Sequence, residues 1–122
     1  MEQHSRLTTM GPRQKRHEAA GIYSVCSSHP RVLAAAFARP SADNSELLIE
    51  ATCNQVNQFR GYTGMTPAEF AAHIRSMADR MQFPKDRLMI GGDHLGPHVW
   101  RSEPAEAAME KAQTLVEQCV AA

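Results

Sequence analysis

The sequence of 122 residues predicts an α/β protein, in which helices cover a parallel sheet. Two observations lead to this prediction. Short runs of residues that favour strands alternate three times with longer runs that have helical spacing. Turn-forming residues separate these runs. The β-α order implies parallel strands, either in an open doubly wound sheet or in a closed barrel.

A polar extension precedes the first strand. Residues 1–20 contain Gly11 and Pro12, a pair that interrupts helices. We therefore expect only a short helix here, over residues 13–20. We assign residues 1–20 to an N-terminal extension and residues 21–122 to the α/β domain.

The first strand and its helix come next. Residues 22–26 read Ile-Tyr-Ser-Val-Cys, and these types favour a strand. A helix is expected over residues 31–38, because Pro30 suits a first helical turn and helix formers follow it. Pro40 has no backbone N–H to donate, so we expect this helix to end before it.

The second unit has the best-defined helix start. Residues 47–52 predict a strand, and a long polar loop follows them. The Thr66 hydroxyl can accept from the N–H of Glu69, whose carboxylate can reach back to the N–H of Thr66. Pro67 suits the first helical position. The apolar stripe behind this start should lie in the core: Phe70, Ile74, Met77 and Met81.

The third unit begins with a strand that ends in glycines. Residues 88–92 read Leu-Met-Ile-Gly-Gly, and Ser102 is the expected cap of the helix that follows. We expect that helix to have one buried face, made of Ala108, Met109, Ala112, Leu115, Val116, Cys119 and Val120.

Composition excludes several classes of protein. The 13 Lys and Arg residues balance the 13 Asp and Glu residues, which argues against a nucleic-acid or anionic-membrane binder. No apolar run approaches the roughly 20 residues that span a bilayer. The three cysteines have no metal-binding spacing, and no signal peptide is evident. These features predict a soluble, cytoplasmic protein without a nucleic-acid or membrane partner.

Polar side chains follow each predicted strand. In both parallel architectures the carboxyl ends of the strands meet at one rim, where ligands bind. The first strand contributes Ser24, Cys26, Ser27, Ser28 and His29; the second contributes Glu50, Thr52, Asn54, Gln55, Asn57 and Gln58; the third contributes Asp93 and His94. Such a set suits a polyhydroxylated ligand, although polar loops also occur without a function. We predict substrate contacts from Ser24, Asn54, Gln55 and Asn57.

The third strand ends in Asp93 and His94, the best candidates for catalysis and metal binding. Adjacent side chains at a strand end diverge, so Asp93 and His94 are expected to have different tasks. A carboxylate can carry protons, and a neutral imidazole is a good ligand for zinc or a similar divalent ion. His29 and His98 are further candidate ligands. The alternative is that His94 is a hydrogen-bonded structural residue.

Three long stretches resemble one family: residues 21–30, residues 48–67, and residues 91–97 with their continuation to 111. They are similar to the N-terminal part of the non-catalytic subunit of class II D-tagatose-1,6-bisphosphate aldolase. The resemblance implies a partial TIM (β/α)₈ barrel. We expect the chain to hold about the first three βα units of a longer protein and to be inactive alone.

The resemblance also implies a function. The family subunit supports the activity and stability of a catalytic class II aldolase subunit in the breakdown of galactitol and N-acetylgalactosamine. The alternative is a metal-dependent ketose epimerase or aldolase that acts without a partner, and whether the subunit is itself an enzyme stays open. The ligand would be a sugar phosphate or a ketose. By resemblance Asp93 is the acid/base group and His94 binds a divalent metal, with zinc expected.

A kinase activity has no support in the residues. Gly61 and Gly64 fall between a strand and a helix, but they lack the spacing of a P-loop or of a dinucleotide-binding loop.

Overall fold

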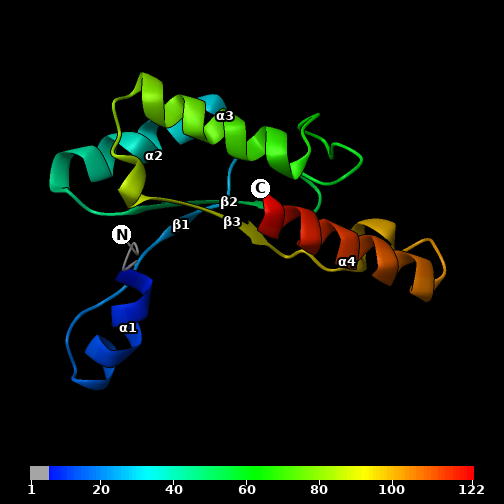
Figure 1. The fold of residues 1–122 in the computed structure, drawn as a ribbon, viewed down its shortest axis with the longest axis horizontal. Coiled ribbons are helices and arrows are strands. Elements are labelled where there is room, and N and C mark those ends of the chain that lie inside the picture. Colours follow the sequence, from blue (N-terminus) through cyan, green and yellow to red (C-terminus); the bar gives the residue numbers. More distant parts are fainter. Residues whose placement is uncertain (1–5) are drawn as a thin grey trace.

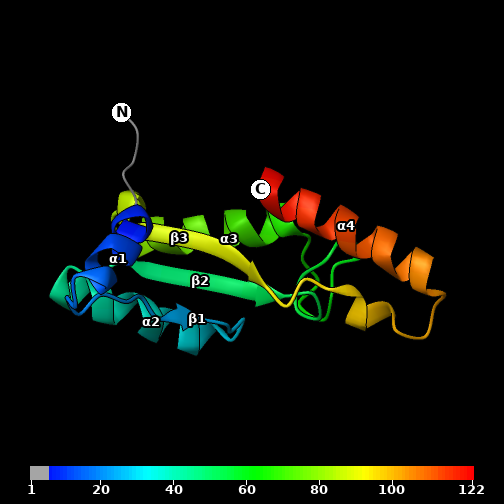
Figure 2. The same cartoon turned by 90° about the horizontal axis from the view of Figure 1, so that it is seen from below.

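The computed structural model describes residues 6–122 (Figures 1 and 2). In chain order the helices and strands are α1 (Arg6–Lys15), β1 (Ser24–Val25), α2 (Pro30–Asp43), β2 (Leu47–Thr52), α3 (Pro67–Arg80), β3 (Leu88–Asp93) and α4 (Ala105–Ala121). Two short 3₁₀ helices, η1 (Lys85–Arg87) and η2 (Pro97–Trp100), flank β3. None of the helices in the described part of the chain has the length and apolar character needed to cross a membrane.

The strands form one parallel sheet in the order β1-β2-β3. β2 pairs with β3 from Leu47 opposite Leu88 to Thr52 opposite Asp93. The predicted parallel α/β architecture is therefore confirmed, and the strand predicted over residues 47–52 has the observed limits of β2.

The two faces of the sheet differ. Figure 1 shows α2 and α3 together on one side of it. The side chains on that face form the main core with the two helices: Leu33 and Phe37 of α2; Leu47, Ile49 and Ala51 of β2; Phe70, Ile74 and Met77 of α3. Leu48, Glu50 and Thr52 alternate with the buried residues of β2 and are half-buried on the opposite face. We call this second surface the open face.

The start of α3 follows the sequence prediction. The Thr66 hydroxyl accepts from the N–H of Glu69, and the Glu69 carboxylate accepts from the N–H of Thr66 at 2.8 Å. This capping box satisfies two N–H groups that a helix start leaves unpaired. Of the predicted apolar stripe, only Met81 is partly exposed, because it lies at the C-cap of the helix.

The short helix of the N-terminal extension lies earlier than predicted. α1 contains Pro12, whereas residues 18–20 lie outside any helix or strand. His17 has a left-handed conformation (φ 60°) that turns the chain away from the helix. The side chains of Arg13 and Gln14 then bond the backbone carbonyls of Ala19 and Ala20, so they hold the extended segment against the helix.

The expected end of α2 before Pro40 was wrong. The helix runs through Pro40 and ends at Asn44, which has the left-handed conformation of a helix C-cap (φ 59°). Pro40 is fully buried, and the burial of its ring offsets part of the cost of the missing hydrogen bond. Next to it, the Ser41 hydroxyl donates to the Phe37 carbonyl at 2.8 Å.

The start of α4 also differs from the prediction. Pro104, not Ser102, is the N-cap residue, and no side chain caps this helix start. A proline disfavours helical conformation in the residue before it, so α4 begins only at Ala105.

Three of the seven residues predicted to form the buried face of α4 are exposed. Ala108, Ala112 and Leu115 pack with Trp100 and Cys53 in a second apolar cluster. The neighbouring stripe is exposed: Met109, Val116 and Val120. Helical spacing identifies apolar stripes but does not say which of two adjacent stripes finds a neighbour.

Candidate functional site

The candidate site lies on the open face, toward the carboxyl ends of the strands. Because Ser24 pairs with Leu48 and Thr52 pairs with Asp93, these residues belong to the same side of the sheet as Glu50. Figure 2 shows α1 beside the opposite end of the sheet, where β2 begins. The polar rim predicted from the sequence therefore contains Ser24, Glu50, Thr52 and Asp93 on one surface.

The side chains of Asp93 and His94 lie close together instead of diverging. His94 Nδ1 lies 2.8 Å from Asp93 Oδ2. The left-handed conformation of His94 (φ 51°) ends the alternation of the strand and turns the imidazole back toward the carboxylate. The His94 side chain is 82% exposed, whereas that of Asp93 is 34% exposed. The pair thus presents a half-buried carboxylate beside a solvated ring.

The donors of this region do not make a complete metal site by themselves. Among residues 6–122, no three His, Cys, Asp or Glu side chains lie close enough together to hold an ion. His29 instead caps α2, with Nδ1 accepting from the N–H of Arg31 at 3.3 Å, and His98 lies in η2. His94 and Asp93 offer suitable donor atoms, but zinc sites take three or four protein ligands.

Asn57 holds the loop that follows β2. Its amide nitrogen donates to the Cys53 carbonyl at 2.8 Å, and its Oδ1 accepts from the N–H groups of Phe59 and Gly61. Asn57 is buried, whereas Asn54 is exposed at the start of the loop. Substrate contact by these two residues stays a prediction, and the geometry gives Asn57 a positioning task.

Gln55 joins the ends of β1 and β2. Its Oε1 accepts from the backbone N–H of Thr52 at 2.7 Å, and the Cys26 thiol lies 3.5 Å from the same oxygen. Desolvation of the thiol raises the pKa of Cys26, and the negative charges of Asp93 and Glu50 raise it further. Cys26 therefore stays a neutral thiol and is not an activated nucleophile.

The turn at residues 60–64 is built from its own hydrogen bonds. The N–H groups of Gly61, Tyr62 and Thr63 donate to Asn57 Oδ1, the Asn54 carbonyl and the Gln55 carbonyl. Gly61 has φ 50°, and a Cβ there would lie 2.4 Å from the Gln55 carbonyl oxygen. Because its N–H groups are used internally, this turn has no cradle of free donors for a phosphate.

Sequence reasoning placed Glu50 among the rim residues but gave it no task. Its carboxylate has no hydrogen-bond or ion-pair partner among residues 7–122. The residue opposite it on β3 is Gly91, which has no side chain. The signal was available in the sequence, since a charged residue alternates with apolar core residues inside a short strand.

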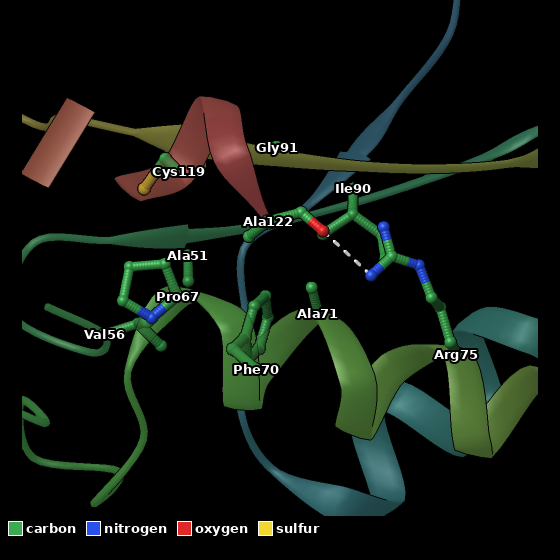
Figure 3. Close-up of a pocket in the computed structure, with 10 residues that line it drawn as sticks. All are labelled: Ala51, Val56, Pro67, Phe70, Ala71, Arg75, Ile90, Gly91, Cys119 and Ala122. Carbon is green, nitrogen blue, oxygen red and sulfur yellow. Dashed lines mark hydrogen bonds between the residues drawn. The ribbon is translucent and has the colours of Figure 1, made fainter. Parts of the chain in front are cut away.

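A small cavity lies on the helix-covered face of the sheet and is a gap in the packing. Figure 3 shows it between the sheet, α3 and the end of α4, where Arg75 Nη1 donates to the Ala122 backbone oxygen at 3.0 Å. Its lining is mostly apolar and its volume is about 70 Å³. Small-molecule sites usually measure several hundred Å³, so this cavity is too small for a sugar.

Comparison with known proteins shows what this chain is similar to. A family model described as "D-tagatose-1,6-bisphosphate aldolase subunit GatZ/KbaZ-like" matches residues 7–122. The crystal structure of a probable tagatose 6-phosphate kinase from Sinorhizobium meliloti 1021 is similar, with 48% sequence identity and a TM-score of 0.79. The match covers 83% of this chain and 26% of that one, so this chain spans about a quarter of the length of that protein.

Proposed function

Because this chain belongs to the GatZ/KbaZ-like family of D-tagatose-1,6-bisphosphate aldolase subunits, we propose that it is part of an accessory subunit of a class II aldolase. The accessory subunit supports the activity and stability of a separate catalytic subunit in galactitol and N-acetylgalactosamine catabolism. The family match over residues 7–122 is the observation that supports this assignment. A cytoplasmic location is part of the same proposal.

The proposed fold of the whole protein is a (β/α)₈ barrel. The three βα units described above would be its first three. Two observations support this. Helices α2 and α3 cover one face of the sheet, as on the outside of a barrel, and polar residues lie on the other face. The similar structure from S. meliloti supports a common fold for the matched region.

The proposed ligand is a sugar phosphate or a ketose, bound at the carboxyl ends of the strands. Ser24 and Gln55 lie at the ends of neighbouring strands and offer hydroxyl and amide groups for hydrogen bonds to a sugar. Asn54 is exposed beside them, and Asn57 fixes the loop. Asp93 is the proposed acid/base group, because its half-buried carboxylate lies at a strand end and is oriented by His94.

The second candidate function is a metal-dependent ketose epimerase or aldolase that acts without a partner. The Asp93–His94 pair favours it, since the two residues offer a proton carrier and a metal donor. In this case His94 binds a divalent ion, with zinc proposed, together with ligands from outside residues 6–122.

We propose no kinase activity for this chain, although the similar structure is that of a probable kinase. The loop that precedes α3 uses its N–H groups internally and lacks phosphate-loop spacing.

One experiment separates the two candidate functions. The natural full-length protein is purified and assayed for D-tagatose 1,6-bisphosphate cleavage, first alone and then with a catalytic class II aldolase subunit. The accessory function predicts no turnover alone, together with a longer half-life and a higher rate for the catalytic subunit. Turnover or epimerisation without the partner, abolished by Asp93→Asn and by a chelator, would instead establish an enzyme. If neither is seen, both assignments fail.

A further inference from the structure

Glu50 has neighbours on both sides in the sheet that leave its carboxylate unpaired in the described chain. This residue lies in the middle of β2 on the open face, two residue pairs before Thr52 and Asp93. The register of β1 against β2, with Ser24 opposite Leu48, brings Cys26 level with Glu50 on the other side. The carboxylate therefore lies between a thiol and a glycine. It finds no ion-pair or hydrogen-bonding partner among residues 7–122.

Gly91 leaves space beside this carboxylate. A Cβ at Gly91 would lie 3.7 Å from Glu50 Cβ, 3.9 Å from Glu50 Oε2 and 3.6 Å from Leu48 Cδ1. These are ordinary contact distances, so packing does not require a glycine here. The backbone conformation does not require one either, because Gly91 has no positive φ. The missing side chain instead leaves the sheet surface beside Glu50 open to a ligand.

Gln55 supplies the second, independent observation. The residue is only 6% exposed, and its orientation is fixed because Oε1 must face the N–H of Thr52. Its Nε2 then donates to no group among residues 7–122 and is open to solvent. This donor is held in a fixed orientation beside Cys26, where a ligand oxygen can accept from it in place of water.

We propose that Glu50 is a specificity-determining residue that accepts hydrogen bonds from the hydroxyl groups of the sugar, while Gln55 Nε2 donates to a sugar oxygen. The inference rests on the proposed sugar ligand. Glu50 and Asp93 place two carboxylates on this surface, and they repel a phosphate but accept from hydroxyls. The unphosphorylated part of the carbon chain therefore lies over β2 and β3, and any phosphate lies away from them.

The test compares two sugars on matched variants. Calorimetric titration of the natural full-length protein uses D-tagatose and D-tagatose 6-phosphate as the probes. Glu50→Gln keeps the size of the side chain but replaces one acceptor oxygen by a donor. We expect it to weaken both sugars about ten- to a hundredfold and by the same factor, because the lost bonds are to hydroxyls. Glu110→Gln, on the exposed surface of α4, is the control and should change neither.

The Gly91→Ala variant tests the same sugar position without changing the charge of Glu50. Its methyl group fits the folded chain at 3.6 Å or more, so the thermal midpoint should stay within a few degrees. Sugar affinity should fall about tenfold or more, because the methyl group occupies the proposed sugar position. This variant also covers the case in which Glu50→Gln does not fold.

The contrary outcomes are distinct. Wild-type affinity in both Glu50→Gln and Gly91→Ala would overturn the inference and leave the proposed sugar ligand intact. Tighter binding of D-tagatose 6-phosphate by Glu50→Gln would also overturn it, because Glu50 would then act only by repelling phosphate. If the wild-type protein binds neither sugar, the proposed ligand itself is wrong, and the inference fails with it.

Discussion

The two faces of β2 differ in almost every physical respect, although they alternate along the same six residues. Ile49 is completely buried against α2 and α3, while its neighbour Glu50 is half-buried and has no protein partner in the described chain. The strand repeats every two residues, so one side can carry the core while the other carries polar groups. Substitutions on the open face can therefore be made without disturbing the core on the other side of this strand.

The largest expected effect is on the helix-covered face. Ile49→Ala should lower the free energy of unfolding by about 2–5 kcal/mol, because it leaves a cavity in a packed core. Leu48→Ala, one residue away on the open face, should cost about 1 kcal/mol or less. Urea unfolding of the two variants measures both values. Equal losses would contradict the comparison, since the open face would then be packed as tightly as the core.

An intermediate effect is expected where the β2–α3 loop passes the rim. Gly61→Ala should cost about 2–4 kcal/mol, because its Cβ would lie 2.4 Å from the Gln55 carbonyl oxygen in a left-handed conformation. Gly64 is a matched control, with φ 77° but no atom within 4 Å of an added Cβ. Gly64→Ala should cost only about 1 kcal/mol. Similar losses in thermal unfolding would show that backbone conformation, not crowding against Gln55, decides both.

The smallest effect concerns the end of α2, away from the rim. Hydrogen bonds from Ser45, and then from Arg39, lower the pKa of Asp43 from 3.8 to about 2. A carboxyl with a lowered folded-state pKa stabilises the fold above its unfolded pKa, and this contribution is lost as the pH falls through the folded value. Stability should therefore decline between about pH 4 and pH 2, and less steeply in Asp43→Asn.

Thermal midpoints across that range of pH measure this effect, with Asp86→Asn as the control. Asp86 is exposed in η1. The same slope in wild type and Asp43→Asn would mean that these hydrogen bonds do not form in solution.

Features that depend on residues close together in the sequence, or on the order of the elements, were predictable. β2 was predicted with its observed limits because its composition and flanking turns act within six residues. The capping box at Thr66 was predicted because both partners are three residues apart. The rim was predicted from the rule that parallel strands share a carboxyl edge, which needs only the order of the elements.

The remaining features depend on contacts between residues far apart in the sequence. Pro40 is tolerated within α2 because its ring is buried, and burial depends on the whole core. Only the folded loop shows that Asn57 faces inward. The turn of His94 onto Asp93 requires a left-handed residue, which local spacing does not predict.

The sequence by itself therefore determined the α/β class, the parallel order of the strands and the family. These depend on residue types and spacing, which the chain carries before it folds. The tertiary structure alone decided which stripe of α4 is covered, which rim amides are used internally, and that Glu50 and Gln55 Nε2 are left without partners in the described chain. A hydrogen-bond partner or a packing neighbour is a position in space, and only folding brings it within reach.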